Sequence, residues 1–340
     1  MSFASVEGQE RAVDSLRRAL KSGRLHHAFL FAGPDGVGKS LTAFKLAEAL
    51  LCEAPADGEG CGTCRACRRV PERQHPDFHV LERGQKPDGR PEASIRIDQV
   101  RALQHDLGFK SYEAGRRVVL ILEAERMNPA TANALLKTLE EPGPETHFVL
   151  VSAAPHLLLP TILSRCQRVR FAPLERPVVA RHLARLAELP PAAADLLAGL
   201  AEGSISKGVA LSQSRVLEQR AALVERLEPD QGLDAVPALL DLAEQLGRST
   251  EDLPLVLHLL RTWYRDVLLI QAGSPLTGLV HLDRSDALVA LAARVPQRRV
   301  LGFIDALNEA EHAIFARSGN ARLFLERLLC HLALAEQQAA

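Results

Sequence analysis

The sequence predicts an α/β core of the P-loop nucleotide-binding class, followed by helical domains. The first observation is residues 33–40, Gly-Pro-Asp-Gly-Val-Gly-Lys-Ser, which lie between an apolar run at 28–32 and a segment at 41–51 with apolar residues at helical spacing. The second is two further apolar runs, 118–122 and 148–151, that alternate with helix-like segments. The third is the Ala/Leu/Arg/Glu-rich second half of the chain. Together they predict a parallel sheet covered on both faces and then helices.

The remaining elements of the core are predicted from spacing and capping. Residues 1–27 are expected to form a helical lead-in, and residues 97–107 a second helix with one apolar side. Asn128 is expected to cap a helix that has Pro129 at its first position, because both residue types favour those positions.

We predict three domains. The nucleotide-binding domain covers residues 1–173, with a cysteine-rich module inserted at 52–67. A small helical domain is expected at 174–217 and a larger helical domain at 218–340. Breaks between their helices are predicted near residues 190, 229–235, 272–277 and 295.

Composition narrows the class of protein. The 340 residues carry a net charge of −1, with 47% hydrophobic and 24% charged residues, which are ordinary values for a globular chain. This charge argues against a protein that coats nucleic acid, although a local basic patch is compatible with it. The start of the sequence has no signal-peptide pattern, and no apolar run approaches the ~18 residues of a membrane span. We therefore expect a cytoplasmic protein without membrane contact.

The phosphate loop predicts ATP binding with Mg²⁺. Its glycines allow successive backbone N–H groups to converge on phosphate oxygens. Lys39 is expected to neutralise β/γ-phosphate charge and Ser40 to hold Mg²⁺. The predicted nucleotide-binding residues of the loop are Gly33, Pro34, Asp35, Gly36, Val37, Gly38, Lys39 and Ser40.

The apolar run at 118–122 predicts weak or absent hydrolysis. A P-loop nucleotidase usually ends this strand with Asp-Glu, where the Asp orients Mg²⁺ and the Glu positions the attacking water. Leu122 occupies the place of the Asp, and Glu123 that of the Glu. Glu123 is thus a candidate catalytic carboxylate, with a solvent-facing residue at a strand end as the alternative interpretation.

Four cysteines predict a metal site. Cys52, Cys61, Cys64 and Cys67 supply four thiolates with Cys-x-x-Cys spacing, which favours a closed, structural Zn²⁺ site. An iron–sulfur cluster and a redox pair remain alternatives. The nearby basic residues Arg65, Arg68 and Arg69 are compatible with contacts to DNA phosphates or with simple compensation of thiolate charge.

Three segments carry a family resemblance. Residues 24–34 (Arg-Leu-His-His-Ala-Phe-Leu-Phe-Ala-Gly-Pro), 133–142 (Asn-Ala-Leu-Leu-Lys-Thr-Leu-Glu-Glu-Pro) and 161–166 (Thr-Ile-Leu-Ser-Arg-Cys) resemble the bacterial clamp-loader subunits of DNA polymerase III, within the AAA+ class. The cysteine cluster also fits that family. The resemblance is dense over residues 5–175 and implies an AAA+ core, a helical lid and a helical oligomerisation collar.

Two subunit types of that family are alternative assignments for this chain. The gamma/tau type is the ATP-hydrolysing motor, and the delta-prime type is a stator-like subunit. The His26-His27 lead-in, the segment at 97–101, Leu122, and an end at residue 340 without the long extension of tau favour delta-prime.

The resemblance also implies roles for single residues. Arg165 is expected to be an arginine finger that reaches ATP held by a neighbouring subunit. Ser152, at the first-sensor strand, and Lys207, next to the second-sensor position at Ser206, are weaker candidates for nucleotide contact.

The expected function is therefore a non-motor subunit of the clamp loader. Its implied partners are the gamma/tau and delta subunits of a hetero-pentamer, and through them the sliding clamp and primed DNA. The motor subunit is the runner-up. A P-loop kinase for small molecules is disfavoured, because half of the chain is helical without an evident acceptor site.

Overall fold

The computed structural model describes residues 3–113, 115–227, 253–317 and 323–328 of the 340. The chain forms two compact units. The first, called here the α/β unit, comprises residues 1–178 together with 203–207; the second, called the helical unit, comprises residues 179–202 and 208–340. The predicted division of the helical half at residue 217 stays a prediction.

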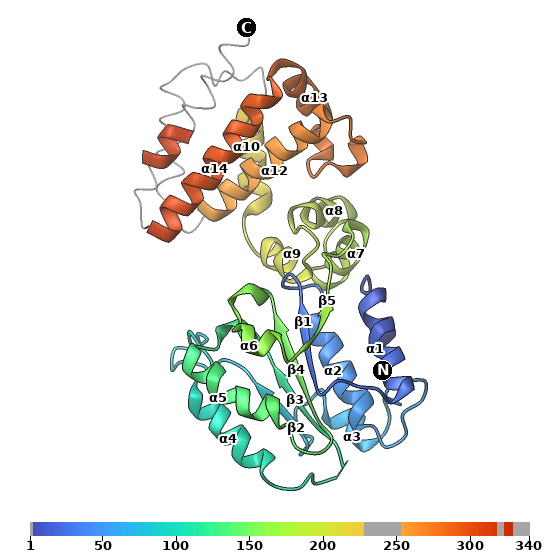
Figure 1. The fold of residues 1–340 in the computed structure, drawn as a ribbon. Coiled ribbons are helices and arrows are strands. Elements are labelled where there is room, and N and C mark those ends of the chain that lie inside the picture. The colour runs from blue at the N-terminus through green and yellow to red at the C-terminus, as the bar shows by residue number, and fades with distance from the viewer. Residues whose placement is uncertain (1–2, 114, 228–252, 318–322, 329–340) are drawn as a thin grey trace. The chain divides into compact units, whose positions relative to one another are not determined.

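The α/β unit is built on one five-stranded parallel sheet (Figure 1). Its order is β2-β3-β4-β1-β5, so the strand that precedes the phosphate loop lies between β4 and β5. The register aligns Ala28 with Phe148 and Ala32 with Ser152. The strands are β1 (Ala28–Ala32), β2 (Phe78–Leu81), β3 (Arg117–Ile121), β4 (Thr146–Ser152) and β5 (Gln167–Arg170).

Helices cover both faces of this sheet. In Figure 1, α1, α2 and α3 lie on one face and α4, α5 and α6 on the other. Alternate residues of each central strand, such as Leu30, Ile121 and Leu150, pack in the core with α4, α5 and α6. The helices are α1 (Glu10–Ser22), α2 (Lys39–Leu51), α3 (Arg65–Arg69), α4 (Ile97–Leu107), α5 (Pro129–Glu140) and α6 (Pro160–Leu163).

The predicted elements of the core are confirmed where local signals were strong. The strand at 28–32 and the helix at 97–107 have the predicted bounds. Asn128 caps α5, since its Oδ1 accepts a hydrogen bond from the N–H of Thr131 at 2.9 Å, and Pro129 is the first helical residue.

Two strands were not predicted, β2 and β5. Both are edge strands of four residues. In β5 only Val169 is buried, and Gln167, Arg168 and Arg170 are exposed. An edge strand buries little of its surface, so these sequences lack the continuous apolar run that marks the three central strands.

The chain after β5 is helical throughout its described part, as predicted. In the helical unit, α12 contacts α10, α13 and α14. A buried polar network ties the loop at 280–283 to these helices: Arg220 Nε donates to His281 Nδ1 at 3.0 Å, and Asp266 accepts the N–H of His281 at 2.8 Å. The helices are α7 (Arg176–Leu186), α8 (Pro191–Leu200), α9 (Ile205–Ser212), α10 (Val216–Leu227), α12 (Leu253–Gln271), α13 (Ser285–Arg294) and α14 (Gln297–Arg317).

The predicted break at 229–235 lies outside the described residues. The breaks predicted at 272–277 and at 295 are confirmed, because α12 ends at Gln271 and α13 ends at Arg294. Within the described ranges, no helix has the length and apolar character that crossing a membrane requires.

Candidate functional site

The carboxyl ends of four parallel strands meet around one pocket. The phosphate loop follows β1, Glu82 follows β2, Glu123 lies just after β3, and Ala153 follows β4. This edge of a parallel sheet is where α/β proteins place their ligands. The pocket has a volume of about 320 Å³ and is lined by Asp35, Gly36, Gly38, Lys39, Ser40, Leu41, Glu82, Leu122, Glu123, Glu125, Val151 and Ala153.

The phosphate loop has the backbone that anion binding requires. Gly36 and Gly38 adopt left-handed conformations with φ of 69° and 96°, and α2 begins directly afterwards at Lys39. Successive N–H groups of such a turn, at the start of a 13-residue helix, form a concave site for phosphate oxygens. The predicted loop residues thus fit a nucleotide with its Mg²⁺, with Ser40 supplying a hydroxyl at the pocket wall.

The tip of the loop is covered by residues 203–207, the segment that holds the expected second-sensor position at Ser206. The N–H of Ile205 donates to the carbonyl oxygen of Gly36 at 3.0 Å. A Cβ atom on Gly36 would lie 2.2 Å from Ser206 Oγ and 2.5 Å from Ser204 Oγ. Glycine is therefore required at residue 36 for two reasons, its left-handed φ and this close approach.

Lys39 is held by the loop itself. Its side chain is 4% exposed, and Nζ donates to the carbonyl oxygens of Gly33, at 2.7 Å, and of Pro34. Asp35 Oδ1 lies 3.6 Å from Nζ. Burial lowers the pKa of Lys39, while the charges of Asp35 and Glu125 oppose that effect. A phosphate group would thus compete with the loop carbonyls for this ammonium.

Glu123 is paired with an arginine. Arg83 Nε donates to Glu123 Oε2 at 2.7 Å, and Arg83 Nη2 donates to Oε1 at 2.8 Å. Glu123 also has a left-handed backbone, with φ of 47°, at the turn after β3. Both carboxylate oxygens are thus engaged by a guanidinium, and a role for Glu123 in positioning water stays a prediction. Leu122 lines the pocket at the place of the metal-orienting Asp.

Glu125 is a pocket residue that the sequence analysis missed. Its Oε1 accepts the N–H of Ala153 at 3.1 Å, which joins the turn after β3 to the end of β4. Its Oε2 is buried without a hydrogen-bond partner among the described residues. The only sequence signal was an acidic residue three positions after the apolar run 118–122, and its place in the pocket follows only from the geometry of the turn.

The two weaker nucleotide candidates lie away from the pocket wall. Ser152 is fully buried in β4, and its neighbours Val151 and Ala153 line the pocket instead. The backbone N–H of Lys207 donates to Ser204 Oγ at 3.1 Å, and Lys207 is not among the lining residues. The predicted contacts of Ser152 and Lys207 with nucleotide stay predictions.

Arg165 lies on a turn between α6 and β5. The turn is anchored by Ile162, which is fully buried, and by the N–H of Arg165, which donates to the carbonyl oxygen of Ile162 at 3.1 Å. The guanidinium is about one-third exposed (34%) and contacts Glu140 at the end of α5, with 2.6 Å between Nη2 and Oε1. The side chain is therefore accessible from outside the α/β unit and stands apart from the pocket lining.

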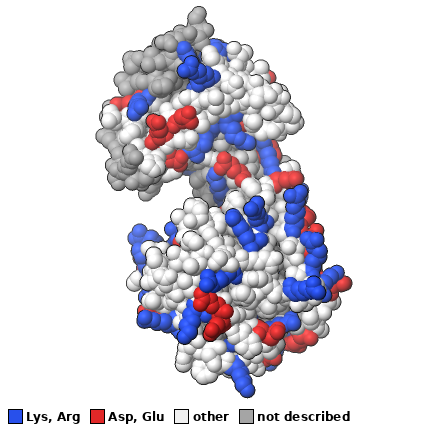
Figure 2. Space-filling model, viewed as in Figure 1, with Lys and Arg blue, Asp and Glu red and all other residues white. Residues whose placement is uncertain are grey.

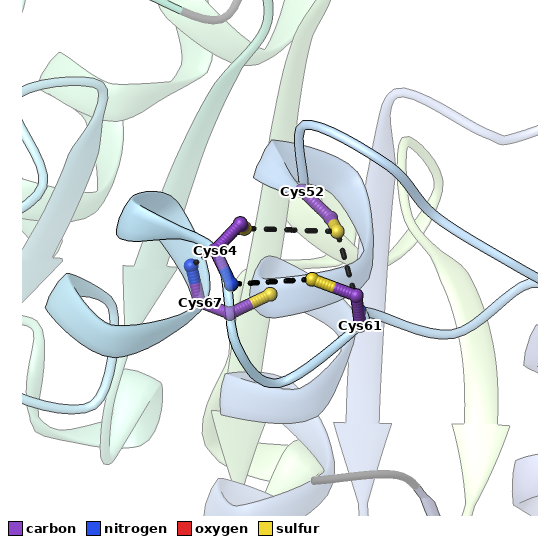
Figure 3. Close-up of side chains that lie close together, drawn as sticks. All are labelled: Cys52, Cys61, Cys64 and Cys67. Atoms are coloured by element: carbon purple, nitrogen blue, oxygen red, sulfur yellow. Dashed lines mark hydrogen bonds between the residues drawn. The ribbon is translucent and has the colours of Figure 1, made fainter.

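The four predicted metal ligands come together after α2. Cys52 follows the last residue of α2, and Cys61, Cys64 and Cys67 come from the loop and first turn of α3 (Figure 3). All four sulfur atoms lie within 4.8 Å of one another. Sulfur atoms around a tetrahedral Zn²⁺ are separated by about 3.8 Å, close to the 3.9 Å between Cys52 Sγ and Cys64 Sγ. The cluster fits a metal ion.

Backbone N–H groups are directed at these sulfur atoms. The N–H of Cys61 donates to Cys52 Sγ at 3.2 Å, and the N–H of Cys64 donates to Cys61 Sγ at 3.3 Å. Such hydrogen bonds from backbone groups lower the pKa of the exposed Cys61 to about 6, whereas burial raises the pKa of Cys67 and of Cys52. A bound cation would favour the thiolate form of all four residues.

The three arginines next to the cysteine cluster differ in their contacts. Arg69 Nη1 donates to both oxygens of Glu113 at 3.1 Å, and Arg69 also donates to the carbonyl oxygen of Gln74. Arg65 and Arg68 are exposed. On the face drawn in Figure 2, Lys and Arg residues are interspersed with Asp and Glu. Contact of this run with DNA stays a prediction, and Arg69 serves an internal ion pair.

Comparison with known proteins identifies the family. A model described as "DNA polymerase III, delta subunit" matches residues 8–175, and one described as "DNA polymerase III, delta subunit, C terminal" matches residues 214–333. The chain is 30% identical to DNA polymerase III subunit tau of Escherichia coli over 253 residues, which cover 71% of this chain and 38% of that protein.

Two delta' proteins match over a larger share of both chains. Identity to DNA polymerase III subunit delta' of Pseudomonas aeruginosa is 37% over 308 residues, which cover 89% of this chain and 90% of that protein. Identity to subunit delta' of Bacillus subtilis is 32% over 336 residues, covering 98% of this chain and 97% of that protein. The chain therefore belongs to the delta' subunit family of DNA polymerase III.

Proposed function

We propose that this chain is the stator-like subunit of a bacterial clamp loader and that Arg165 completes the ATP site of a neighbouring subunit. The observation that carries this proposal is the placement of Arg165. It lies on a turn anchored in the core, is accessible from outside the unit, and does not line the pocket of its own phosphate loop. A guanidinium so placed reaches phosphate only on another chain, where it stabilises charge on the transferring phosphoryl group.

The chain's own pocket supports nucleotide binding more than hydrolysis. The glycine turn, Lys39 and Ser40 provide groups for phosphate and Mg²⁺. Hydrolysis in addition requires a carboxylate that orients the metal and one that positions water. Leu122 supplies neither, and the carboxylate of Glu123 is occupied by Arg83. We therefore propose that ATP or ADP with Mg²⁺ binds here and is turned over slowly or not at all.

The proposed partners follow from family membership. They are the gamma/tau and delta subunits of a hetero-pentamer that opens the sliding clamp and places it on primed DNA. In this scheme the described helices α10, α12, α13 and α14 belong to a collar that holds the subunits together. The cysteine cluster is proposed to hold a structural Zn²⁺, because four sulfur ligands leave no open coordination position for a substrate.

The test is reconstitution of the complex with Arg165→Ala. If Arg165 acts on a neighbour's ATP, hydrolysis at that site falls by about a thousandfold and clamp loading is lost, while assembly measured by size-exclusion chromatography is unchanged. Arg168→Ala is the matched control, because Arg168 is an exposed arginine three residues further along, in β5. An intact rate with Arg165→Ala in an assembled complex overturns the proposal.

The alternative function is an ATP-hydrolysing motor subunit of the same clamp loader. One measurement distinguishes it from the stator. A motor subunit hydrolyses the ATP on its own loop, so steady-state phosphate release by the isolated chain, abolished by Lys39→Ala, supports the motor. Absence of that activity, with nucleotide binding retained, supports the stator.

A further inference from the structure

The guanidinium of Arg165 is held through its two Nη groups. Nη1 donates to the carbonyl oxygen of Thr161 at 2.9 Å and lies 3.3 Å from Ser164 Oγ. Nη2 forms an ion pair with Glu140 Oε1 at 2.6 Å. Among the described residues nothing accepts a hydrogen bond from Nε, so Nε–H stays open.

A guanidinium recognises phosphate through its N–H groups, two of which can match two phosphate oxygens. The partners already present, a carbonyl of its own turn and a carboxylate of α5, thus orient the group and leave its Nε–H for an acceptor on another chain.

Glu140 has an unfavourable place in its helix. It is the last residue of α5, where the helix dipole disfavours a negative charge, and Glu141 follows it. The adjacent guanidinium of Arg165 compensates for this charge. The pair therefore stabilises both members in one arrangement, although each side chain is partly exposed, at 34% for Arg165 and 48% for Glu140.

We propose that Glu140 is a positioning residue that pre-orients Arg165 for the phosphate of the neighbouring subunit. A free arginine side chain samples many rotamers. The loss of this conformational entropy opposes the contact with phosphate on which hydrolysis depends. Ion pairing with Glu140 restricts those rotamers before the subunits meet. This inference rests on the proposed function of Arg165, since a positioned arginine matters only if it acts on a phosphate.

The chain offers a matched control. Glu141 is adjacent, exposed and acidic, and no ion pair joins it to a described residue. Glu140→Gln and Glu141→Gln change the net charge equally at neighbouring positions of the same helix end. Glu140→Asp keeps the charge, although its shorter side chain reaches Arg165 less well.

The experiment compares these variants in the reconstituted complex. The readout is the Arg165-dependent rate, defined as the ATPase rate of the complex minus that of the Arg165→Ala complex. We expect Glu140→Gln to lower the kcat of this rate about fivefold, the effect of an ion pair of about 1 kcal/mol. KM and assembly should be unchanged, and any fall in melting temperature should stay within about 2–4 °C. Glu140→Asp should restore part of the rate, and Glu141→Gln should have no effect on it.

A second readout separates positioning from folding. Affinity of the complex for ADP with aluminium fluoride, which mimics the transferring phosphoryl group, should fall in parallel with kcat for Glu140→Gln. Equal kcat for the Glu140→Gln and Glu141→Gln complexes overturns the positioning role and leaves the function of Arg165 intact. If Arg165→Ala itself leaves the ATPase of an assembled complex unchanged, the proposed function and this inference both fail.

Discussion

The phosphate-loop pocket and the turn that carries Arg165 differ in how their charges are paired. In the pocket, Lys39 is bonded to loop carbonyls and Glu123 to Arg83 through both oxygens. At the turn, Arg165 is engaged through Nη1 and Nη2, and no described residue accepts a hydrogen bond from its Nε–H. A reactive side chain can act only through the hydrogen-bonding groups that its neighbours leave unused.

Among the changes that test this difference in pairing, Arg165→Lys should have the largest effect. A lysine keeps the charge but cannot make the bidentate contact, and it loses the orienting contacts on the Nη edge. We expect ATP hydrolysis at the neighbouring subunit's site to fall by about a hundredfold. This is less than the roughly thousandfold fall expected for alanine. Steady-state ATPase of the reconstituted complex measures it. Full activity with lysine contradicts the need for a guanidinium at residue 165.

The second prediction concerns two substitutions that supply the carboxylates needed for hydrolysis in the pocket. Leu122→Asp places a carboxylate where Mg²⁺ is oriented, and Arg83→Gln releases Glu123. We expect Leu122→Asp to strengthen Mg²⁺-dependent ADP binding about tenfold, the effect of one charge-assisted contact. Measurable phosphate release should require both changes. Calorimetric titration with and without Mg²⁺ and a phosphate-release assay test this.

Two results contradict that prediction. Rapid ATP hydrolysis by the unaltered chain would show that the pocket hydrolyses ATP without these two substitutions. Equal ADP affinity of the Leu122→Asp variant with and without Mg²⁺ shows that residue 122 does not face the metal position. Glu82→Gln serves as the control for a charge change at the pocket wall.

Metal removal should affect the two regions unequally. Helix α2 starts at Lys39 and is followed directly by Cys52, while the carbonyl oxygen of Glu48 accepts a weak hydrogen bond from Cys67 Sγ at 3.8 Å. The cysteine cluster and the phosphate loop thus lie at opposite ends of one helix. We expect chelation to lower the melting temperature of the α/β unit by about 5–10 °C.

Hydrogen exchange locates this effect. Amides at the end of α2 and in residues 52–67 should lose protection, whereas amides of 160–166, near Arg165, should keep it. Cys67→Ser should reproduce the loss. Cys166→Ser is the control, since its thiol lies outside the cluster and burial raises its pKa to about 12. Equal loss of protection in both regions contradicts the unequal coupling.

The smallest expected effect is a pH dependence of stability. It arises in the sheet that carries both the phosphate loop and the turn of Arg165. Burial lowers the pKa of His79 in β2 and of His147 in β4 below the value of about 6.5 expected in the unfolded chain. As pH falls below about 6.5, the unfolded chain binds more protons than the folded chain, so the free energy of unfolding decreases. Above that pH these histidines contribute no pH dependence.

We expect the melting temperature to fall by about 2–4 °C between pH 7.5 and pH 5.5. His147→Asn should reduce this dependence. Scanning calorimetry measures both proteins at several pH values. A melting temperature that does not change over this range, or an identical slope in the variant, contradicts the assignment to buried neutral histidines.

The parts of the fold that the sequence predicted well depend on local chemistry. The apolar run of β1, the glycines of the loop and the cap of α5 by Asn128 each specify backbone conformation within a few residues. The four cysteines also lie within sixteen positions, so their spacing alone predicts a cluster. Strands β2 and β5 were missed because edge strands bury little apolar surface and carry no such local signal.

The residues alone predicted a nucleotide-binding loop, a four-cysteine cluster, an absent metal-orienting Asp and a family. Which charged groups remain available depends on contacts made in three dimensions. Arg83 reaches Glu123 because β2 and β3 are neighbours in the sheet, and Glu140 reaches Arg165 because α5 packs near α6. These partners are separated by 40 and 25 positions, so their pairing depends on strand order and helix packing rather than on local spacing.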